Sequence, residues 1–451
     1  AFQDGRLDPY VLEPYRETLA AASSTLAEEA DVLAGVDLSG TVDALREPFE
    51  DLEEQVRTLG DLVGDASVAA ELLPAMLGGE GERTYVVIVQ NNAEPRTTGG
   101  IPGAVIELSV IDGRIELEQY VEGGAMTDTA GAVDLTEDEL RVFTRRMAVY
   151  PQNVNFTPDY PRTAQLMSEF WESKYGTAPD GVLSIDPVAF GYMLEGAPAT
   201  RIGPFTVTSG NLADVMLRDS YLEFPSPQDQ NEFFALASVT LFSQVVEGDA
   251  NLLSGLDRAI SEARFMAWSG NAREQELLAS SAVGGAFLED GDTLGVFVND
   301  GSGAKIGYYV DVETSVESRM CSDGSLAGQS LRVVLTHTFG GDVDALPHYV
   351  ATGAAGLPNG EFQANLRVFP AVGTGITGAT IDGETTGINP EQIDGRALAT
   401  ARVVLTPGET AVYTFNIVAN EPGLGEPGVA ITPGPKPNVY SRTSIVVMDN
   451  C

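Results

Sequence analysis

The chain has 451 residues, which is too long for one ordinary hydrophobic core, so two or three domains are expected. Its 66 acidic residues outnumber 25 basic ones, and the net charge of −41 argues against binding nucleic acid or an anionic lipid surface. Such a surface permits weakly held divalent cations, Ca²⁺ or Mg²⁺, although no motif specifies a cofactor or a metal. Arginine far outnumbers lysine among the basic residues, which fits a genome rich in G+C.

Residues 1–78 are predicted to form a helical hairpin. Apolar residues recur every seven positions from Leu12 to Leu33, and a second seam follows a glycine-bounded break at 35–40. A third short helix is expected at 67–76, and Pro48 could kink the second helix. The hairpin would serve as a collar on the next domain or as a stalk for oligomerisation. The second seam consists of Val42, Leu45, Phe49, Leu52, Val56, Leu59 and Val63.

Residues 79–285 alternate strand and helix patterns, which predicts an α/β layered core domain. Strands are expected at 84–90, 104–110, 114–120 and 181–185. Helices are expected at 136–147, 161–175, 187–194, 229–247 and 251–268, the first of them opened by a capping box of Thr136 and Glu139.

Residues 286–451 lose helical periodicity and gain Gly, Pro, Thr and Val, which predicts an immunoglobulin-like β-sandwich. Strands are expected at 294–299, 306–312, 331–338, 362–369, 401–405, 411–418 and 444–448, and the stretch 421–437 is expected to be a loop. A disulfide between Cys321 and Cys451 is preferred over two free buried thiols, and it would place the protein in an oxidising compartment.

A polar cluster directly follows the apolar strand at 85–89. Amide donors, one carboxylate and one guanidinium in this cluster suit a phosphate or carboxylate ligand at a strand end. The alternative is structural, with an Arg96–Glu94 ion pair that fixes a tight turn and two asparagines that cap backbone groups. The cluster also contains Thr97, and its candidate ligand-binding residues are Gln90, Asn91, Asn92, Glu94, Arg96 and Thr98.

A second candidate ligand-binding patch consists of Arg145, Arg146, Asp159 and Arg162. The first two arginines are expected at a helix C-terminus, where a cation is favoured without any ligand. Asp186, Asp219 and Tyr221 near element ends could complete a pocket, if the fold brings them together.

No catalytic residue is assigned. The two histidines, His337 and His348, both fall in the predicted β-domain, and no nucleophile elbow, zinc-protease, Walker or EF-hand pattern is present. The acidic loop at 289–292 could hold calcium weakly, but solvated loops of this kind are far commoner. No apolar run reaches the roughly 18 residues that a membrane span needs. We expect a processed chain whose membrane anchor, if there is one, precedes residue 1.

Four segments resemble the bacterial domain-of-unknown-function family 4012. They are RTYVVIVQNNAEPRTTGG (83–100), NVNFTPDYP (153–161), DGVLSIDPVAF (180–190) and VFVNDGSGAKIGYYV (296–310). The resemblance implies an envelope protein with an N-terminal membrane anchor, and it assigns no activity.

The core is also distantly similar to LytR-CpsA-Psr proteins, which implies a phosphotransferase that moves glycopolymers from polyprenyl-pyrophosphate carriers with Mg²⁺. The sequence departs from that pattern at three places. Arg96-Thr97-Thr98 stands where Arg-Ser-Asp would be, the strand end at 118–122 has no arginine, and the segment 226–232 is acidic where an arginine-rich run would clamp the pyrophosphate. Because pyrophosphate transfer depends on cations, these departures disfavour it.

The expected function is therefore that of a non-catalytic, extracytoplasmic protein of the cell envelope or a secreted protein, acting as a binding or assembly module. Its expected partners are cell-wall glycan, other envelope proteins or a second copy of the chain. The alternatives are a self-assembling surface-layer or filament subunit and a divergent glycopolymer phosphotransferase that uses Arg96, Arg145 or Arg162.

Overall fold

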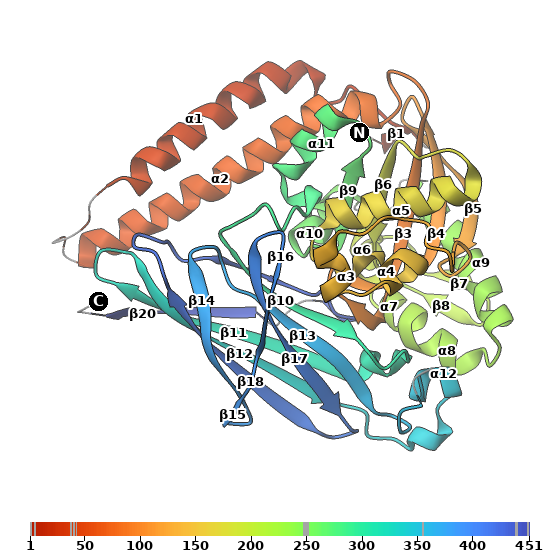
Figure 1. Cartoon of the computed structure of the whole chain (residues 1–451). Coiled ribbons are helices and arrows are strands. Elements are labelled where there is room, and N and C mark those ends of the chain that lie inside the picture. The colour runs from red at the N-terminus through yellow and green to blue at the C-terminus, as the bar shows by residue number, and fades with distance from the viewer. Residues whose placement is uncertain are drawn as a thin grey trace.

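The computed structural model describes residues 2–3, 6–36, 38, 41, 43–246, 252–353, 356–437, 441–448 and 451. The expected seam residue Val42 and part of the break at 35–40 lie outside this set. The described chain is mixed α/β, as predicted, with a helical hairpin, a seven-stranded sheet flanked by helices, and two further sheets of five and six strands (Figure 1).

The hairpin consists of α1 (Arg16–Ala34) and α2 (Asp43–Met76), which lie side by side and extend away from the seven-stranded sheet (Figure 1). The separate third helix predicted at 67–76 was wrong, because α2 continues through it with Pro48 and Pro74 inside. Gly60 lets the helices approach, since a Cβ there would lie 3.7 Å from the Leu26 Cβ. The last turns of α2 pack through Val68, Leu72 and Met76 on α11 (Ala272–Ala279) and its surroundings.

The seven-stranded sheet has the order β1-β2-β5-β4-β3-β6-β9. The pair β3–β6 is parallel and the pairs β3–β4, β4–β5 and β6–β9 are antiparallel, so β3 lies between β4, which directly follows it in the chain, and the distant β6. The strands are β1 (Phe2–Gln3), β2 (Arg6–Leu7), β3 (Arg83–Arg96), β4 (Gly99–Ile111), β5 (Arg114–Glu122), β6 (Gly181–Ile185) and β9 (Phe265–Ser269).

Helices cover both faces of this sheet. One core cluster joins Val86 and Val182 to Phe170 of α5 (Tyr160–Tyr175), and a second joins Tyr85 and Val87 to helices α6 and α10. The remaining elements of this part are α3 (Glu137–Val142), α4 (Arg146–Val149), η2 (Pro151–Phe156), α6 (Pro187–Met193), β7 (Thr200–Ile202), β8 (Phe205–Val207), α7 (Leu212–Asp214), η3 (Val215–Asp219), α8 (Ser220–Glu223), α9 (Pro227–Val246), α10 (Leu252–Ser261) and η4 (Ala282–Gly284).

Two predicted helices of the core were wrong in extent. The helix at 136–147 has the expected capping box, but it breaks at Thr144, which adopts φ +68°. Two short helices, α3 and α4, replace it. The helix at 251–268 ends at Ser261 and gives way to the edge strand β9, because Phe265–Ser269 completes the sheet beside β6.

The C-terminal part holds two sheets that enclose a common core of Val, Leu, Ile and Phe side chains. Their orders are β16-β17-β13-β10-β19 and β15-β14-β18-β12-β11-β20. The strands are β10 (Thr293–Asp300), β11 (Val310–Cys321), β12 (Leu326–His337), β13 (Phe362–Phe369), β14 (Thr374–Ile381), β15 (Glu384–Thr386), β16 (Asn389–Ile393), β17 (Arg396–Leu405), β18 (Thr410–Ala419), β19 (Gly428–Ile431) and β20 (Ser441–Met448), with the short helices η5 (Lys305–Tyr309), η6 (Val343–Ala345) and α12 (His348–Ala351) between them.

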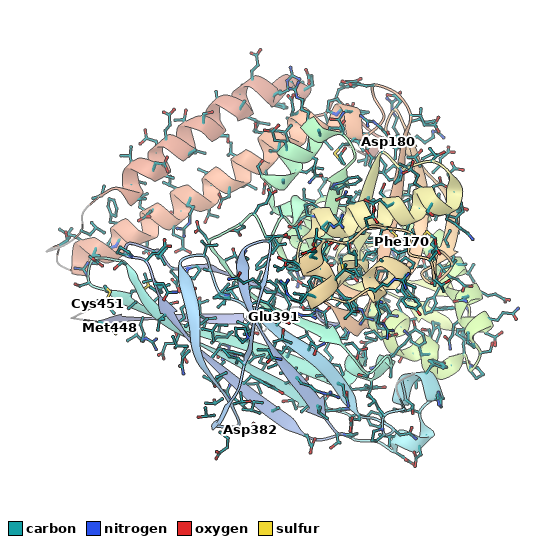
Figure 2. The ribbon with its side chains drawn as sticks, viewed as in Figure 1. Phe170, Asp180, Asp382, Glu391, Met448 and Cys451 are labelled. Atoms are coloured by element: carbon teal, nitrogen blue, oxygen red, sulfur yellow. A yellow bond between two sulfur atoms is a disulfide. The ribbon has the colours of Figure 1, made fainter. Side chains whose placement is uncertain are left out.

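Each predicted strand of this part coincides with an observed one except that at 306–312, where η5 precedes β11. The sequence reading missed β14, β15 and β16, and it took β19 for loop. The predicted disulfide Cys321–Cys451 is present and ties the last residue to the end of β11 (Figure 2). His337, expected to be half-buried, is fully buried, and its Nε2 lies 2.9 Å from the Gly360 carbonyl oxygen.

Candidate functional site

The polar cluster that follows the first core strand is part of that strand. The expectation that this cluster follows the strand was wrong for residues 90–96, because β3 continues to Arg96 and pairs with β4 as far as Arg96–Gly99, with register shifts at Val89/Gln90 and Asn91/Pro95. Gly100 permits this irregular pairing, since a Cβ there would overlap the backbone of Asn91. The polar side chains therefore project from a strand into the interior of the molecule.

We call Gln90, Asn91, Asn92, Glu94, Arg96, Thr97 and Thr98 the polar seam, and all of them are buried or half-buried. Gln90 donates to the Ser184 hydroxyl of β6, and its Oε1 accepts a hydrogen bond of 2.6 Å from the Gly100 N–H. Asn91 Nδ2 donates to the Tyr221 hydroxyl over 2.7 Å. These contacts hold β3 to its neighbours in the core.

Asn92 connects the seam to a segment of the C-terminal part, residues 432–437, which we call the strap. Its Nδ2 donates to Asp186 Oδ2 over 3.0 Å and to the Pro433 carbonyl over 3.1 Å. Arg264, which is 1% exposed, donates to Asp186 over 2.6 Å and to the carbonyl oxygens of Gly434 (2.9 Å) and Lys436 (2.7 Å). The strap is thus fixed to the core by buried, charge-assisted hydrogen bonds.

The charged residues of the seam also face the C-terminal part. The Arg96–Glu94 ion pair of the structural alternative is not among the ion pairs of the described residues. Glu94 Oε1 instead lies 2.6 Å from Lys305 Nζ, and Arg96 Nη1 lies 3.9 Å from Asp300 Oδ2. Burial opposes ionisation of Glu94, yet Lys305 and Arg96 hold its pKa below the ordinary value. Burial raises the pKa of Asp300 to about 6 despite Arg96.

The polar seam is therefore mainly a junction between the seven-stranded sheet and the C-terminal sheets. Its hydrogen-bonding groups are largely used by protein partners. Three buried atoms are exceptions, Asn92 Oδ1, Arg96 Nε and Thr98 Oγ1, which have no protein partner. Isolated polar atoms of this kind are commonly satisfied by buried water.

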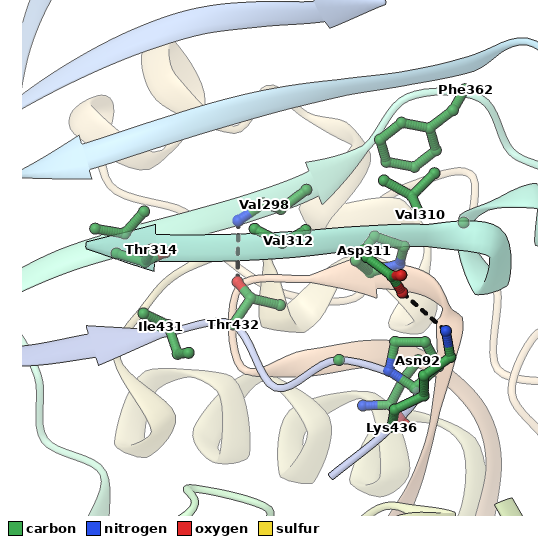
Figure 3. A pocket seen from close by; sticks show the side chains of 15 residues that line it. Asn92, Val298, Val310, Asp311, Val312, Thr314, Phe362, Ile431, Thr432 and Lys436 are labelled. Carbon is green, nitrogen blue, oxygen red and sulfur yellow. Dashed lines mark hydrogen bonds and ion pairs between the residues drawn. The ribbon is translucent and has the colours of Figure 1, made fainter. Parts of the chain in front are cut away.

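A small cavity of about 50 Å³ lies beside Asn92 (Figure 3). Apolar side chains such as Val298, Val312 and Phe362 form most of its lining. The strap borders it, and the Lys436–Asp311 ion pair of 2.8 Å joins the strap to β11 there. A space of this size holds one or two water molecules rather than a substrate.

The three arginines of the second candidate patch do not contact a common site. Arg145 Nη2 donates to the Ala130 carbonyl over 2.9 Å, and Arg146 lies over the Tyr150 ring at 5.5 Å. Their expected place at a helix C-terminus was wrong, because Arg145 is the N-cap of α4 and Arg146 its first residue. Arg162 instead forms a two-pronged contact with buried Glu139, with Nε–Oε1 at 2.6 Å and Nη2–Oε2 at 3.0 Å.

Asp159 and Arg162 do share an open cleft, which we call the acidic cleft. It encloses about 550 Å³ between the start of α5, the segment 134–139 and the β16–β17 turn. Burial raises the pKa of Asp159 to about 6, aided by the nearby charges of Glu289 and Asp394, although its backbone hydrogen bonds from Leu288 and Arg162 act in the opposite direction. The carboxylates that line the cleft are Asp134, Glu139, Asp159 and Asp394, and Arg162 is the single cation among the lining residues.

The other walls of the cleft are apolar or neutral. Trp268, half-buried on β9, lies with Leu288 and Pro161 on its apolar side, and the exposed Gln165 and Thr136 add neutral polar groups. A flat aromatic surface beside carboxylates and amides can take the apolar face and the hydroxyl groups of a sugar. The cleft is thus the part of the described structure best suited to a small polar ligand.

Sequence reasoning found only two residues of this cleft. Trp268 was missed because β9 was taken for helix, and Asp394 was missed because the β16–β17 turn lies 235 residues beyond Asp159 in the chain. The three residues expected to complete a pocket do not meet in one. Asp186 pairs with Arg264, Asp219 with Arg218, and Tyr221 accepts from Asn91.

Two further properties concern the described residues. No helix among them is long and apolar enough to cross a membrane. No group of three or more His, Cys, Asp or Glu side chains among them is arranged to hold a metal ion.

Comparison with known proteins gives a family match. No curated protein matches the chain significantly. The family described as Protein of unknown function (DUF4012) matches residues 80–221, a region that contains three of the four segments on which the resemblance was noted, together with the polar seam and Asp159 and Arg162 of the cleft. Residues 80–221 of the chain are therefore a region of the DUF4012 family.

Proposed function

We propose that this protein is a non-catalytic binding module of the cell envelope, located outside the cytoplasmic membrane, and that its acidic cleft holds a segment of cell-wall glycan. The observation that carries the proposal is the cleft itself. It is large enough for one or two sugar rings, and it combines Trp268 with carboxylate and amide groups.

The charges of the cleft favour a neutral or amine-bearing glycan over a pyrophosphate. Four carboxylates line it, and its one cation, Arg162, already pairs with Glu139. An anionic ligand would face these carboxylates without a free guanidinium to neutralise it. Hydroxyl and ammonium groups, in contrast, can donate hydrogen bonds to Asp159 and Asp394.

The envelope location is supported by the disulfide Cys321–Cys451, since such bonds persist in oxidising compartments. We further propose that the two C-terminal sheets form an immunoglobulin-like sandwich, which their shared core supports, and that the seven-stranded sheet is related to the LytR-CpsA-Psr core. A rigid sandwich joined to the core through the polar seam suits a protein that holds envelope components in place.

The fluorescence of Trp268 tests the proposal. The chain has two tryptophans, so Trp171→Phe leaves Trp268 as the only one. Titration of this variant with a soluble oligomer of N-acetylglucosamine, and with its de-N-acetylated counterpart, should change the emission. Gln165→Ala should weaken binding at least five-fold, whereas Arg145→Ala, outside the cleft, should leave it unchanged. If neither oligomer changes the emission, or if Gln165→Ala has no effect, the cleft is not a glycan site.

One observation favours a second function, that of a self-assembling surface subunit. The strand β20 forms an edge of the six-stranded sheet, and its apolar residues Ile445, Val446 and Val447 are exposed. Exposed apolar edge strands pair readily with another chain. Val446→Lys should then convert large sedimenting particles into monomers, and a chain that is monomeric before the substitution would exclude this function. The phosphotransferase alternative has less support, because Arg96 and Arg162 both lie against carboxylates.

A further inference from the structure

The hairpin carries a row of leucines that no described part of the chain covers. Leu45, Leu52 and Leu59 of α2 are 66%, 48% and 49% exposed, and Leu62 beside them is also exposed. Since the first three recur every seven residues, they lie along one side of the helix. We call these four residues the leucine stripe.

The leucine stripe is distinct from the face of α2 that packs on α1. Gly60 and Gly64 face α1, where a Cβ on either would lie 3.7 Å from Leu26 or Ser23. Leu59 precedes Gly60 by one residue, so it points about 100° away from that contact. The hairpin therefore uses one apolar face internally and leaves a second one in solvent, which is costly unless a partner covers it.

The charges around the stripe indicate what that partner is. Helix α2 contains nine acidic residues and only two basic ones, Arg46 and Arg57. Asp51, Glu54 and Asp61 are exposed along its solvent side. A second copy of the hairpin would bring the same excess of carboxylates against them, and like charges beside an apolar seam oppose pairing.

We propose that the leucine stripe is a docking site for a partner protein that presents a basic amphipathic helix. Apolar residues of that helix would lie on Leu45, Leu52 and Leu59, and its lysines or arginines would face the flanking carboxylates. The hairpin then acts as the arm through which the protein is attached to its partner, while the acidic cleft stays free on the core.

A synthetic leucine–lysine peptide with amphipathic helical spacing is the probe, used with the full chain and labelled for fluorescence anisotropy. The variant Leu52→Glu/Leu59→Glu makes the chain more acidic while it removes the apolar contact. The matched control Ser24→Glu/Thr25→Glu adds the same charge at exposed positions of α1 whose hydroxyls bond to carbonyls of their own helix. Leu52→Ala/Leu59→Ala preserves helix propensity and guards against a folding defect.

The proposal predicts that the peptide binds the unchanged protein and the control variant alike. Binding should weaken at least ten-fold in Leu52→Glu/Leu59→Glu and several-fold in Leu52→Ala/Leu59→Ala. Equal or tighter binding to the glutamate variant would overturn it, because attraction of opposite charges alone would then explain the affinity. Absence of binding would also overturn the proposal. So would a dimer in sedimentation that Leu52→Glu/Leu59→Glu dissociates, because a second copy of the chain would then cover the stripe.

Discussion

Arg264 Nη1 lies 2.6 Å from Asp186 Oδ2, and both side chains are almost completely removed from solvent. This pair joins three parts of the protein, because Asp186 also caps α6 and accepts from Asn92, while Arg264 binds the strap. The strap is therefore anchored to the core through this buried ion pair.

The costs of removing the two partners of this pair should not be additive. Arg264→Met leaves a buried carboxylate without its cation, and we expect a loss of about 3–5 kcal/mol in the free energy of unfolding. The double variant Asp186→Asn/Arg264→Met, in which asparagine still caps α6, should lose clearly less than the sum of the single changes. Urea denaturation measures both, and a loss below about 1 kcal/mol for Arg264→Met would show that the junction does not depend on the pair.

The disulfide should contribute strongly to stability, since it closes a loop across 130 residues of sequence. The chain-entropy treatment gives about 5 kcal/mol for a loop of this length. Cys321→Ser/Cys451→Ser should lower the melting temperature, and a reductant should lower that of the unchanged protein but not that of the variant. Equal melting temperatures with and without reductant would contradict this expectation.

One contribution to the free energy of unfolding should fall as pH rises from about 4 to 6. Burial raises the pKa of Asp159 to about 6, so the folded state binds a proton there more tightly than the unfolded state does. The resulting stabilisation is present below about pH 4 and is lost as pH rises through the folded pKa. Asp159→Asn keeps the helix cap and should gain roughly 2 kcal/mol relative to the unchanged protein between pH 4 and pH 7.

The control for this measurement is Glu172→Gln, on the exposed side of α5. Its stability should follow that of the unchanged protein across the same pH range. If Asp159→Asn tracks the unchanged protein as well, the carboxyl group of Asp159 is not the source of the pH dependence.

Two nearby glycines of β4 should differ sharply in their tolerance of a methyl group. A Cβ at Gly100 would overlap the Asn91 backbone, whereas one at Gly103 would make ordinary contacts, the nearest at 3.5 Å from the Asn91 Cβ. Gly100→Ala should therefore destabilise the protein by more than about 3 kcal/mol, and Gly103→Ala by less than about 1 kcal/mol. Thermal unfolding of the two variants side by side checks this, and similar melting temperatures would show that β3 and β4 adjust easily.

Periodicity in the sequence predicted much of the fold. Strand 362–369 and the capping box at Thr136 were correct because each depends on local pattern or on neighbours within a few residues. Errors arose where tertiary pairing overrides that pattern. Residues 265–269 form a strand because β6 offers a free edge, and residues 90–96 continue β3 because β4 pairs with them.

The candidate site could likewise be predicted only where its residues are close in the sequence. Asp159 and Arg162 could be grouped from sequence because they start one helix, but Trp268 and Asp394 reach the cleft only through the packing of distant segments. The ion-pair partners of the polar seam could likewise not be predicted from the sequence. Lys305 and Asp300, the partners of Glu94 and Arg96, come from the other side of the junction, more than 200 residues away.

The sulfur–sulfur link between Cys321 and Cys451 also determines how the protein responds to mechanical tension. A force applied at residue 451 passes directly into the end of β11 and does not peel β20 away residue by residue. Because β11 is paired with β12 along its length, the force is borne in shear by the interior of that sheet. A protein fastened at this point would keep β20 in place under tension.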